Sequence, residues 1–112
     1  FATLLLASQL ALAELVLIPD LTSRVTDLTQ TLSAEQKTAL EAKLQAFEQK
    51  KGSQIAVLIV PTTQPEDIAQ YSIRVVEKWK LGREKVDDGI LVLLAKDDRK
   101  MRIEVGYGLE CD

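Results

Sequence analysis

The sequence predicts an α/β domain, and three observations support that fold class. Residues 54–60 (QIAVLIV) and 90–95 (ILVLLA) are short apolar runs, of the kind that becomes a strand covered on both faces. Apolar side chains recur at helical spacing in residues 34–51 and again in residues 65–81. A helical pattern separates the two apolar runs, so we expect them to pair as parallel strands joined by a right-handed crossover.

The first helix has clear signals at both ends. Ser33 and Gln36 form a capping box, in which the Ser33 hydroxyl accepts from the Gln36 N–H and the Gln36 side chain reaches back. Gly52, directly after two lysines, is a typical left-handed stop. The apolar stripe between these ends consists of Leu40, Leu44 and Phe47.

The second helix is predicted to begin with Pro65, Glu66 and Asp67 as its first turn and to end at Gly82. The residues at helical spacing within it are Ile68, Tyr71, Val75 and Trp79. We interpret this stripe, including both aromatic residues, as core packing.

A β-hairpin follows, with its turn at residues 96–99. In residues 100–105 apolar and polar side chains alternate, as in a strand with one face covered and one exposed. A turn centred between Asp97 and Asp98 places Gly89 opposite Gly106 and Asp88 opposite Tyr107. Asp87 and Asp88 therefore converge with residues 106–108. The acids of the turn lie roughly 20 Å away, at about 3.3 Å per residue, and are interpreted as a solvent-exposed turn.

Composition excludes several kinds of chemistry. The 112 residues, 46% hydrophobic and 28% charged, form one globular domain without histidine, which excludes Ser-His nucleophiles and imidazole acid–base catalysis. The single cysteine, Cys111, can form no internal disulfide. A net charge of -3 argues against nucleic acid as a partner.

Residues 1–13 (FATLLLASQLALA) have the character of a signal peptide, because an apolar run ends in the small-x-small pattern of Ala11 to Ala13. The apolar stretch is shorter than the ~20 residues of a membrane span and is interrupted by Gln9 and Glu14. We expect a signal-peptide remnant over residues 1–13 and one domain over residues 14–112, exported from the cytoplasm. The alternatives are an uncleaved anchor and a buried amino-terminal helix.

Several segments, in this order, resemble the TPM domain family of bacterial envelope and thylakoid-lumen proteins: VTDLTQTLSAEQ, GSQIAVLIV and VDDGILVLLAKDDRKMRIEVGYGLE. The resemblance implies a three-layer α/β/α sandwich around a mixed sheet, with further helices, and in some members a membrane segment, beyond Asp112. It also implies a periplasmic or extracytoplasmic location, or the thylakoid lumen in a photosynthetic source. Two residues depart from the family pattern: Gln30, where a small residue is usual, and Cys111, where glycine is usual.

The candidate site is a divalent-cation site with Asp87, Asp88 and Glu110 as ligands. The resemblance extends this set to Asp27, Glu104 and Tyr107, and the backbone of Gly106 and Gly108 supplies further oxygens. Carboxylate and carbonyl oxygens suit Ca²⁺, or alternatively Mg²⁺. The alternative is that Asp87, Asp88 and Gly89 are only a tight turn into the strand and Tyr107 a half-buried aromatic.

Three functions are compatible with these features. The hypothesis we favour is an extracytoplasmic accessory or interaction domain with a carboxylate-lined calcium site. The second is an acid phosphatase, as described for some family members, although its general acid would have to be a carboxyl group of raised pKa. The third is a purely structural domain that binds a partner in an envelope or membrane protein complex, the photosynthetic members being associated with photosystem II repair.

Overall fold

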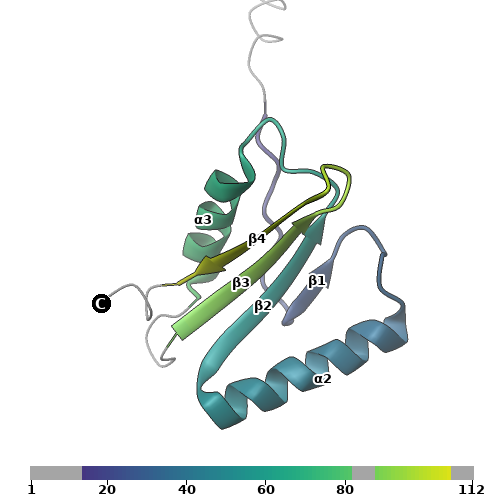
Figure 1. The fold of residues 1–112 in the computed structure, drawn as a ribbon, viewed down its shortest axis with the longest axis vertical. Coiled ribbons are helices and arrows are strands. Elements are labelled where there is room, and N and C mark those ends of the chain that lie inside the picture. Colours follow the sequence, from purple (N-terminus) through teal and green to yellow (C-terminus); the bar gives the residue numbers. More distant parts are fainter. Residues whose placement is uncertain (1–13, 82–87, 107–112) are drawn as a thin grey trace, which may run out of the picture.

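The computed structural model describes residues 14–81 and 88–106, and within them it confirms the α/β fold class. A four-stranded sheet has the order β1-β2-β3-β4, in which the first three strands are parallel and β4 is antiparallel to β3 (Figure 1). The elements are β1 (Val25–Asp27), α2 (Ala34–Lys51), β2 (Ser53–Val60), α3 (Ile68–Trp79), β3 (Asp88–Ala95) and β4 (Lys100–Val105).

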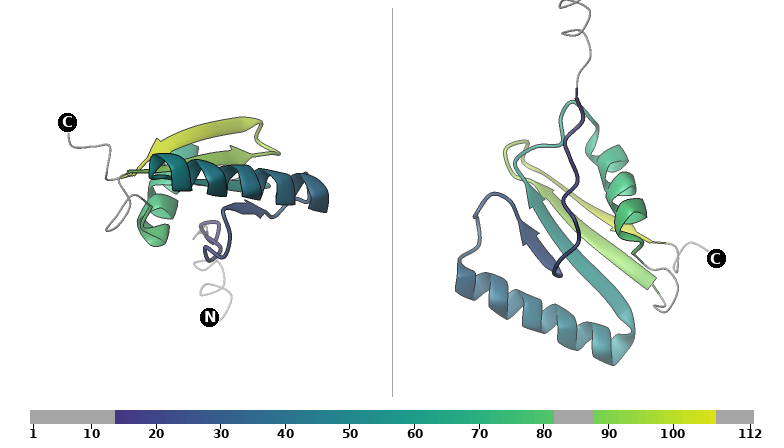
Figure 2. Two further views of the ribbon diagram at one scale, coloured as in Figure 1. Left: turned by 90° about the horizontal axis from the view of Figure 1, so that it is seen from below. Right: turned by 180° about the vertical axis from the view of Figure 1, so that it is seen from behind.

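The two helices cover opposite faces of the sheet, which makes the three layers expected from the family resemblance (Figure 2). On the α3 face, Leu58, Leu91 and Leu93 are fully buried under helix residues that include Tyr71 and Val75. The α2 face is smaller, and its buried residues are Val25, Val57 and Ile59. Leu40 and Leu44 of α2, both partly buried, pack on it. Most of the core therefore lies between the sheet and α3.

Helix α2 has the caps that the sequence predicts. The Gln36 N–H donates to Ser33 Oγ at 3.0 Å, and the Ser33 N–H donates to Gln36 Oε1 at 2.9 Å. Gly52 ends the helix with φ 82°. Gln30, where the family has a small residue, adopts φ 56°, so this residue takes the left-handed turn that glycine would take more easily.

Helix α3 is shorter at its start than predicted, and the prediction that Pro65 to Asp67 form its first turn is wrong. The Glu66 N–H donates to the Thr63 carbonyl at 3.0 Å in a separate turn, and Asp67 is an extended N-cap with ψ 142°. Lys80, with φ 56°, ends the helix. Gly82, the predicted stop, lies outside the described residues. The core role of Tyr71 and Trp79 is confirmed.

The β3–β4 hairpin has the predicted register. Ile90 pairs with Val105 and Ala95 with Lys100, with residues 96–99 as the connecting turn. The apolar side of β4, however, is not covered: Met101 is 63% and Ile103 57% exposed, because α2 packs on β1 and β2 of that face. Neither described helix is long and apolar enough to cross a membrane.

Candidate functional site

The open end of the hairpin is held by a close backbone approach. The Gly106 N–H donates to the Gly89 carbonyl at 2.6 Å, which is the pairing that the sequence predicts. A Cβ on Gly106 would lie 2.4 Å from the Leu81 carbonyl oxygen, so only glycine fits without a backbone shift. The chain after α3 and the facing ends of β3 and β4 therefore meet at one point.

The principal predicted ligands are only partly within the described structure. Asp88 is the first residue of β3 and pairs with Ser53 of β2, so its backbone lies at this open end. Asp87 and Glu110, and with them Tyr107 and Gly108, lie outside the described residues. Their convergence with Asp88 therefore stays a prediction.

Asp27 does not lie at this end of the sheet. It pairs with Ile59, whereas Asp88 pairs with Ser53, six positions earlier on β2. At about 3.3 Å per residue the backbones of the two aspartates are roughly 20 Å apart along the sheet. Asp27 thus belongs to the end where the parallel strands finish, and cannot share an ion with Asp88.

The carboxylate of Asp27 is used to hold the loop between β1 and α2. It accepts from the Thr29 N–H at 2.9 Å, the Thr29 hydroxyl at 2.7 Å and the Leu32 N–H at 2.7 Å. Partial burial acts to raise the pKa of Asp27, but these hydrogen bonds outweigh it and the pKa is lowered. Asp27 is therefore an ionised structural residue, and its hydrogen bonds hold the loop that precedes the N-cap of α2.

Glu104 lies near Gly106 in sequence, but its side chain lies on the α3 face of the sheet and contacts that helix. It accepts from the Ser72 hydroxyl at 3.0 Å and from Arg102 Nε at 3.1 Å, and its side chain is 17% exposed. Within residues 14–81 and 88–106, no group of three acidic or cysteine side chains is placed to hold a metal ion. Of the supporting residues, only Gly106 is seen at the hairpin opening with Asp88.

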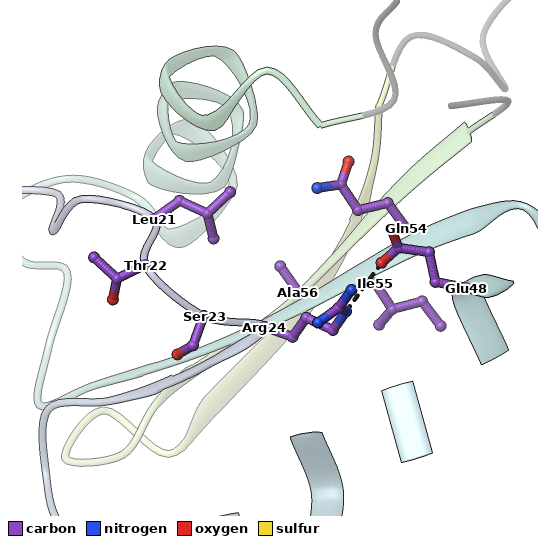
Figure 3. Close-up of a pocket in the computed structure, with 8 residues that line it drawn as sticks. All are labelled: Leu21, Thr22, Ser23, Arg24, Glu48, Gln54, Ile55 and Ala56. Atoms are coloured by element: carbon purple, nitrogen blue, oxygen red, sulfur yellow. Dashed lines mark hydrogen bonds and ion pairs between the residues drawn. The ribbon is translucent and has the colours of Figure 1, made fainter. Parts of the chain in front are cut away.

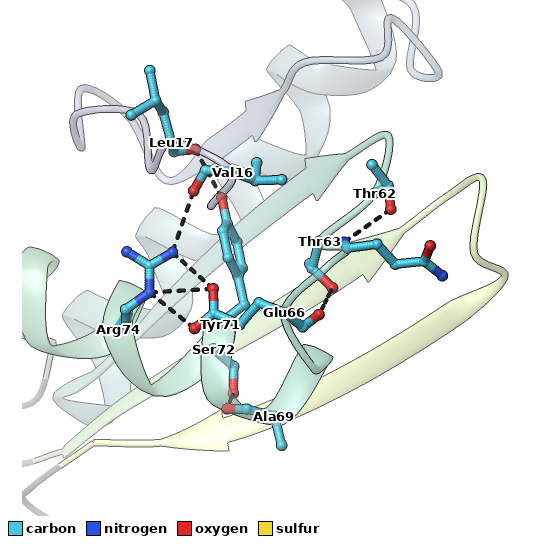
Figure 4. Close-up of polar contacts among 10 residues, drawn as sticks. Val16, Leu17, Thr62, Thr63, Glu66, Ala69, Tyr71, Ser72 and Arg74 are labelled. Carbon is cyan, nitrogen blue, oxygen red and sulfur yellow. Dashed lines mark hydrogen bonds and ion pairs between the residues drawn. The ribbon is translucent and has the colours of Figure 1, made fainter. Parts of the chain in front are cut away.

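Asp98, which the sequence suggested was a solvated turn residue, ties the hairpin turn to the end of β2. Its carboxylate accepts from the Thr62 hydroxyl at 2.7 and 2.9 Å and from the Thr63 N–H at 3.2 Å. The Thr63 hydroxyl in turn donates to the Glu66 carbonyl at 3.1 Å (Figure 4). The two consecutive threonines after Pro61 are the sequence feature from which this contact could have been predicted.

Arg24 is the centre of an ionic cluster that sequence reasoning missed. It lines a cavity of about 180 Å³ between the segment before β1, β2 and α2 (Figure 3). Its Nε donates to Glu48 at 3.0 Å and its Nη1 to Glu41 at 3.2 Å. Hydrogen bonding to Glu48 raises the pKa of Arg24. Seven-residue spacing places both glutamates on one helix face, which was the available signal.

Glu41 also binds the backbone of β1. It accepts from the N–H groups of Arg24, at 3.1 Å, and of Val25, at 3.0 Å. Burial acts to raise the pKa of Glu41, but the N–H groups and the Arg24 guanidinium outweigh it, so the pKa is lowered. One guanidinium and two backbone N–H groups bind the two carboxylates, and these contacts join α2 to the start of β1, so the arrangement is structural.

The segment before β1 is bound along α3 by side-chain donors, another contact that the sequence did not reveal (Figures 2 and 4). Four consecutive carbonyls, from Val16 to Pro19, each accept one hydrogen bond from the helix. The donors, in the order of those carbonyls, are Arg74, Tyr71, Lys78 and Trp79. The apolar side chains of Val16, Ile18 and Leu21 pack on the adjacent core. This segment is therefore part of the folded domain.

The sheet order, the helices on both faces and the hairpin signature define the class of protein as an α/β domain with a mixed four-stranded sheet. Residues 25–111 match the TPM domain family, and the chain is a member of it. No protein of curated function matches the chain.

Two solved structures have a similar fold. The N-terminal domain of a protein from P. gingivalis, determined by solution NMR, is similar with 30% identity and a TM-score of 0.73, covering 83% of this chain and 62% of that one. The N-terminal domain of the cg2496 protein from Corynebacterium glutamicum has 19% identity and a TM-score of 0.66, covering 89% and 63%. The latter shows the fold alone. The chain thus spans less than two thirds of either structure.

Proposed function

We propose that this TPM domain is an extracytoplasmic accessory or interaction domain, and that the open end of its hairpin binds a divalent cation. Ca²⁺ is the expected ion and Mg²⁺ the alternative. The observation that carries the proposal is the 2.6 Å hydrogen bond between the Gly106 N–H and the Gly89 carbonyl. This bond fixes the register at the point where the two acidic segments adjoin the sheet.

Chain connectivity brings the proposed ligands near this point. Asp87 is the residue before β3, and Glu110 is four residues after Gly106. Side chains of Asp87, Asp88 and Glu110, with the carbonyls of Gly106 and Gly108, would supply hard oxygen ligands, which suit Ca²⁺. Asp27 and Glu104 are left out of the proposed set, because their carboxylates already accept hydrogen bonds elsewhere.

Calorimetric titration of the full chain with Ca²⁺ tests the proposal. We expect saturable heat and a higher melting temperature with Ca²⁺, and loss of both in Asp87→Asn/Asp88→Asn. The matched control is Glu35→Gln/Asp97→Asn, which removes two exposed carboxylates, at the start of α2 and in the hairpin turn, and should leave binding unchanged. A double variant at the opening that binds Ca²⁺ like the unmodified chain would refute the site.

Two further measurements separate the cation-binding function from the other functions that the residues allow. Phosphate-ester turnover that co-purifies with the chain and falls in Asp88→Asn would establish an enzyme instead. Recovery of an envelope or membrane protein on the immobilised chain, equally with and without chelator, would favour a structural partner-binding role. Cell fractionation with amino-terminal sequencing tests export, for which a mature start at Glu14 is expected.

A further inference from the structure

An apolar cavity with a cationic rim lies at the β3–β4 turn, away from the proposed cation site. Its volume is about 310 Å³. Ile59, Leu94 and Met101 form its apolar part, and three cationic residues, Lys96, Arg99 and Lys100, border it. Basic groups around an apolar hollow are complementary to an anionic amphiphile, whose phosphate and acyl parts match the two kinds of lining.

The turn that carries these cations is fixed to the sheet. The Lys96 N–H donates to the Val60 carbonyl at 2.9 Å, and the Asp97 N–H to the Pro61 carbonyl at 2.8 Å. Asp98 is directed to Thr62 and Thr63, so its charge is already stabilised by two donors, the Thr62 hydroxyl and the Thr63 N–H. Asp97 is the remaining acid of the turn and is exposed. The three cations thus project from a fixed backbone.

A second apolar feature lies at the same end of the molecule. Leu17 is 87% and Leu15 49% exposed. The segment that carries them runs along α3, with Leu17 next to Tyr71 in the first half of the helix and Pro19 next to Trp79 at its end. Because α3 starts where β2 and β3 finish, the first part of this segment, bound at Leu17 by Tyr71, lies toward the hairpin-turn end (Figure 1). The hydrogen bonds from α3 use the backbone carbonyls of the segment, and the side chains of the two leucines remain exposed to contact another surface.

We infer that this end of the domain docks on an anionic lipid surface. Headgroup phosphates would contact Lys96, Arg99 and Lys100 at the cavity rim, and Met101, Leu15 and Leu17 would enter the interfacial layer. Each cation near such a surface strengthens binding by about fivefold at physiological salt, and salt screens the effect. The docking surface is separate from the hairpin opening, so it neither requires nor excludes a bound cation there.

Vesicle co-sedimentation of the full chain tests the inference. Binding is measured on phosphatidylcholine vesicles and on vesicles in which part of that lipid is replaced by phosphatidylglycerol. The ratio of the two affinities is the readout, because it cancels the contribution of purely apolar contacts. We expect a preference for the anionic vesicles that weakens as NaCl is raised.

Three variants locate the surface. Lys96→Gln/Arg99→Gln/Lys100→Gln should reduce the preference for anionic vesicles by roughly tenfold or more, from about fivefold per cation. The matched control, Lys37→Gln/Lys43→Gln/Lys50→Gln, removes three exposed cations of α2 and should keep most of the preference. Leu15→Ser/Leu17→Ser should weaken binding to both kinds of vesicle and leave the ratio unchanged.

Each of the other outcomes would overturn the inference. Equal affinity for the two kinds of vesicle, or an equal loss in both lysine-containing sets of variants, would show that the turn is not the docking site. Release by inorganic phosphate at constant ionic strength would assign the cations to a soluble phosphate compound. Circular dichroism of each variant confirms that the fold is intact before the ratios are compared.

Discussion

The two faces of the sheet are built from alternate residues of the same strands, yet they differ in how they are covered. On the α3 face, Leu91 and Leu93 of β3 are fully buried. On the α2 face, Leu94 is only partly buried, and its partner on β4, Met101, is 63% exposed. The first face has a closed core, and the second has an apolar surface that the described helices leave partly open.

The difference shows that neighbouring elements, more than the hydrophobic pattern of a strand, decide which side is buried. Glu104 of β4 has a side chain that is 17% exposed, less than the apolar Met101 and Ile103. It is tolerated there because Ser72 and Arg102 donate hydrogen bonds to its carboxylate. The apolar side of β4 stays exposed because α2 packs on β1 and β2.

The largest effect is expected from shortening a leucine on the closed face. Leu93→Ala should lower the free energy of unfolding by about 2–5 kcal/mol, because it leaves a cavity among fully buried side chains. Leu94→Ala, the same change one residue along and on the open face, should cost about 1–2 kcal/mol, since less apolar area is lost. Chemical denaturation of both variants measures the difference. Equal losses would show that the two faces are covered to the same extent.

A smaller loss is expected where β4 ends against the closed face. In Gly106→Ala the new methyl group would meet the Leu81 carbonyl oxygen, at 2.4 Å, and the Leu81 carbonyl carbon, at 3.0 Å. Both are backbone atoms, so the strand must shift, at a cost of about 1–3 kcal/mol. Denaturation measures the stability, and hydrogen exchange of the Gly106 N–H should become faster. An N–H that stays as protected as before would show that the approach is looser than the structure indicates.

The sequence was sufficient for the elements whose signals are local. The capping box of Ser33 and Gln36, the left-handed Gly52 and the hairpin register that pairs Gly89 with Gly106 were all predicted, and the structure confirms them. The start of α3 was predicted wrongly, because Pro65 suits a first helical turn but Thr63 and Glu66 form a separate turn before it. Local rules could not include the contacts of Thr62 and Thr63 with Asp98, which tie the start of that turn to the β3–β4 hairpin.

The candidate site was predictable only in part, for a similar reason. Motif resemblance grouped Asp27 with Asp88, although pairing on β2 places them at opposite ends of the sheet. Contacts between distant segments, such as Lys78 with Ile18 or Tyr71 with Leu17, leave no periodic trace in the sequence. They depend on how the layers are stacked, which the pattern of any single element does not specify.

An acid-dependent effect is expected from Asp27, which lies beside the open α2 face. Its pKa is lower in the folded chain than in the unfolded one, so its contribution is complete above the ordinary value of about 4 and is lost as the pH falls through the folded pKa. Asp27→Asn should cost about 1–2 kcal/mol at pH 7 and reduce the acid sensitivity. Thermal denaturation between pH 7 and acidic conditions measures this. An unchanged slope below pH 4 would contradict the assignment.

The smallest effect is expected from the hydroxyl of Tyr71, which joins the closed face to the segment before β1. Tyr71→Phe keeps the buried ring but removes the 3.0 Å hydrogen bond to the Leu17 carbonyl, at a cost of about 1 kcal/mol. Ser72→Ala is the matched control, since it removes a neighbouring buried hydroxyl that contacts Ala69 and Glu104 instead. Limited proteolysis near residues 16–19 should speed up in the tyrosine variant and not in the serine variant. If both variants are cut at the rate of the unmodified chain, the Tyr71 hydroxyl does not help to hold this segment on the closed face.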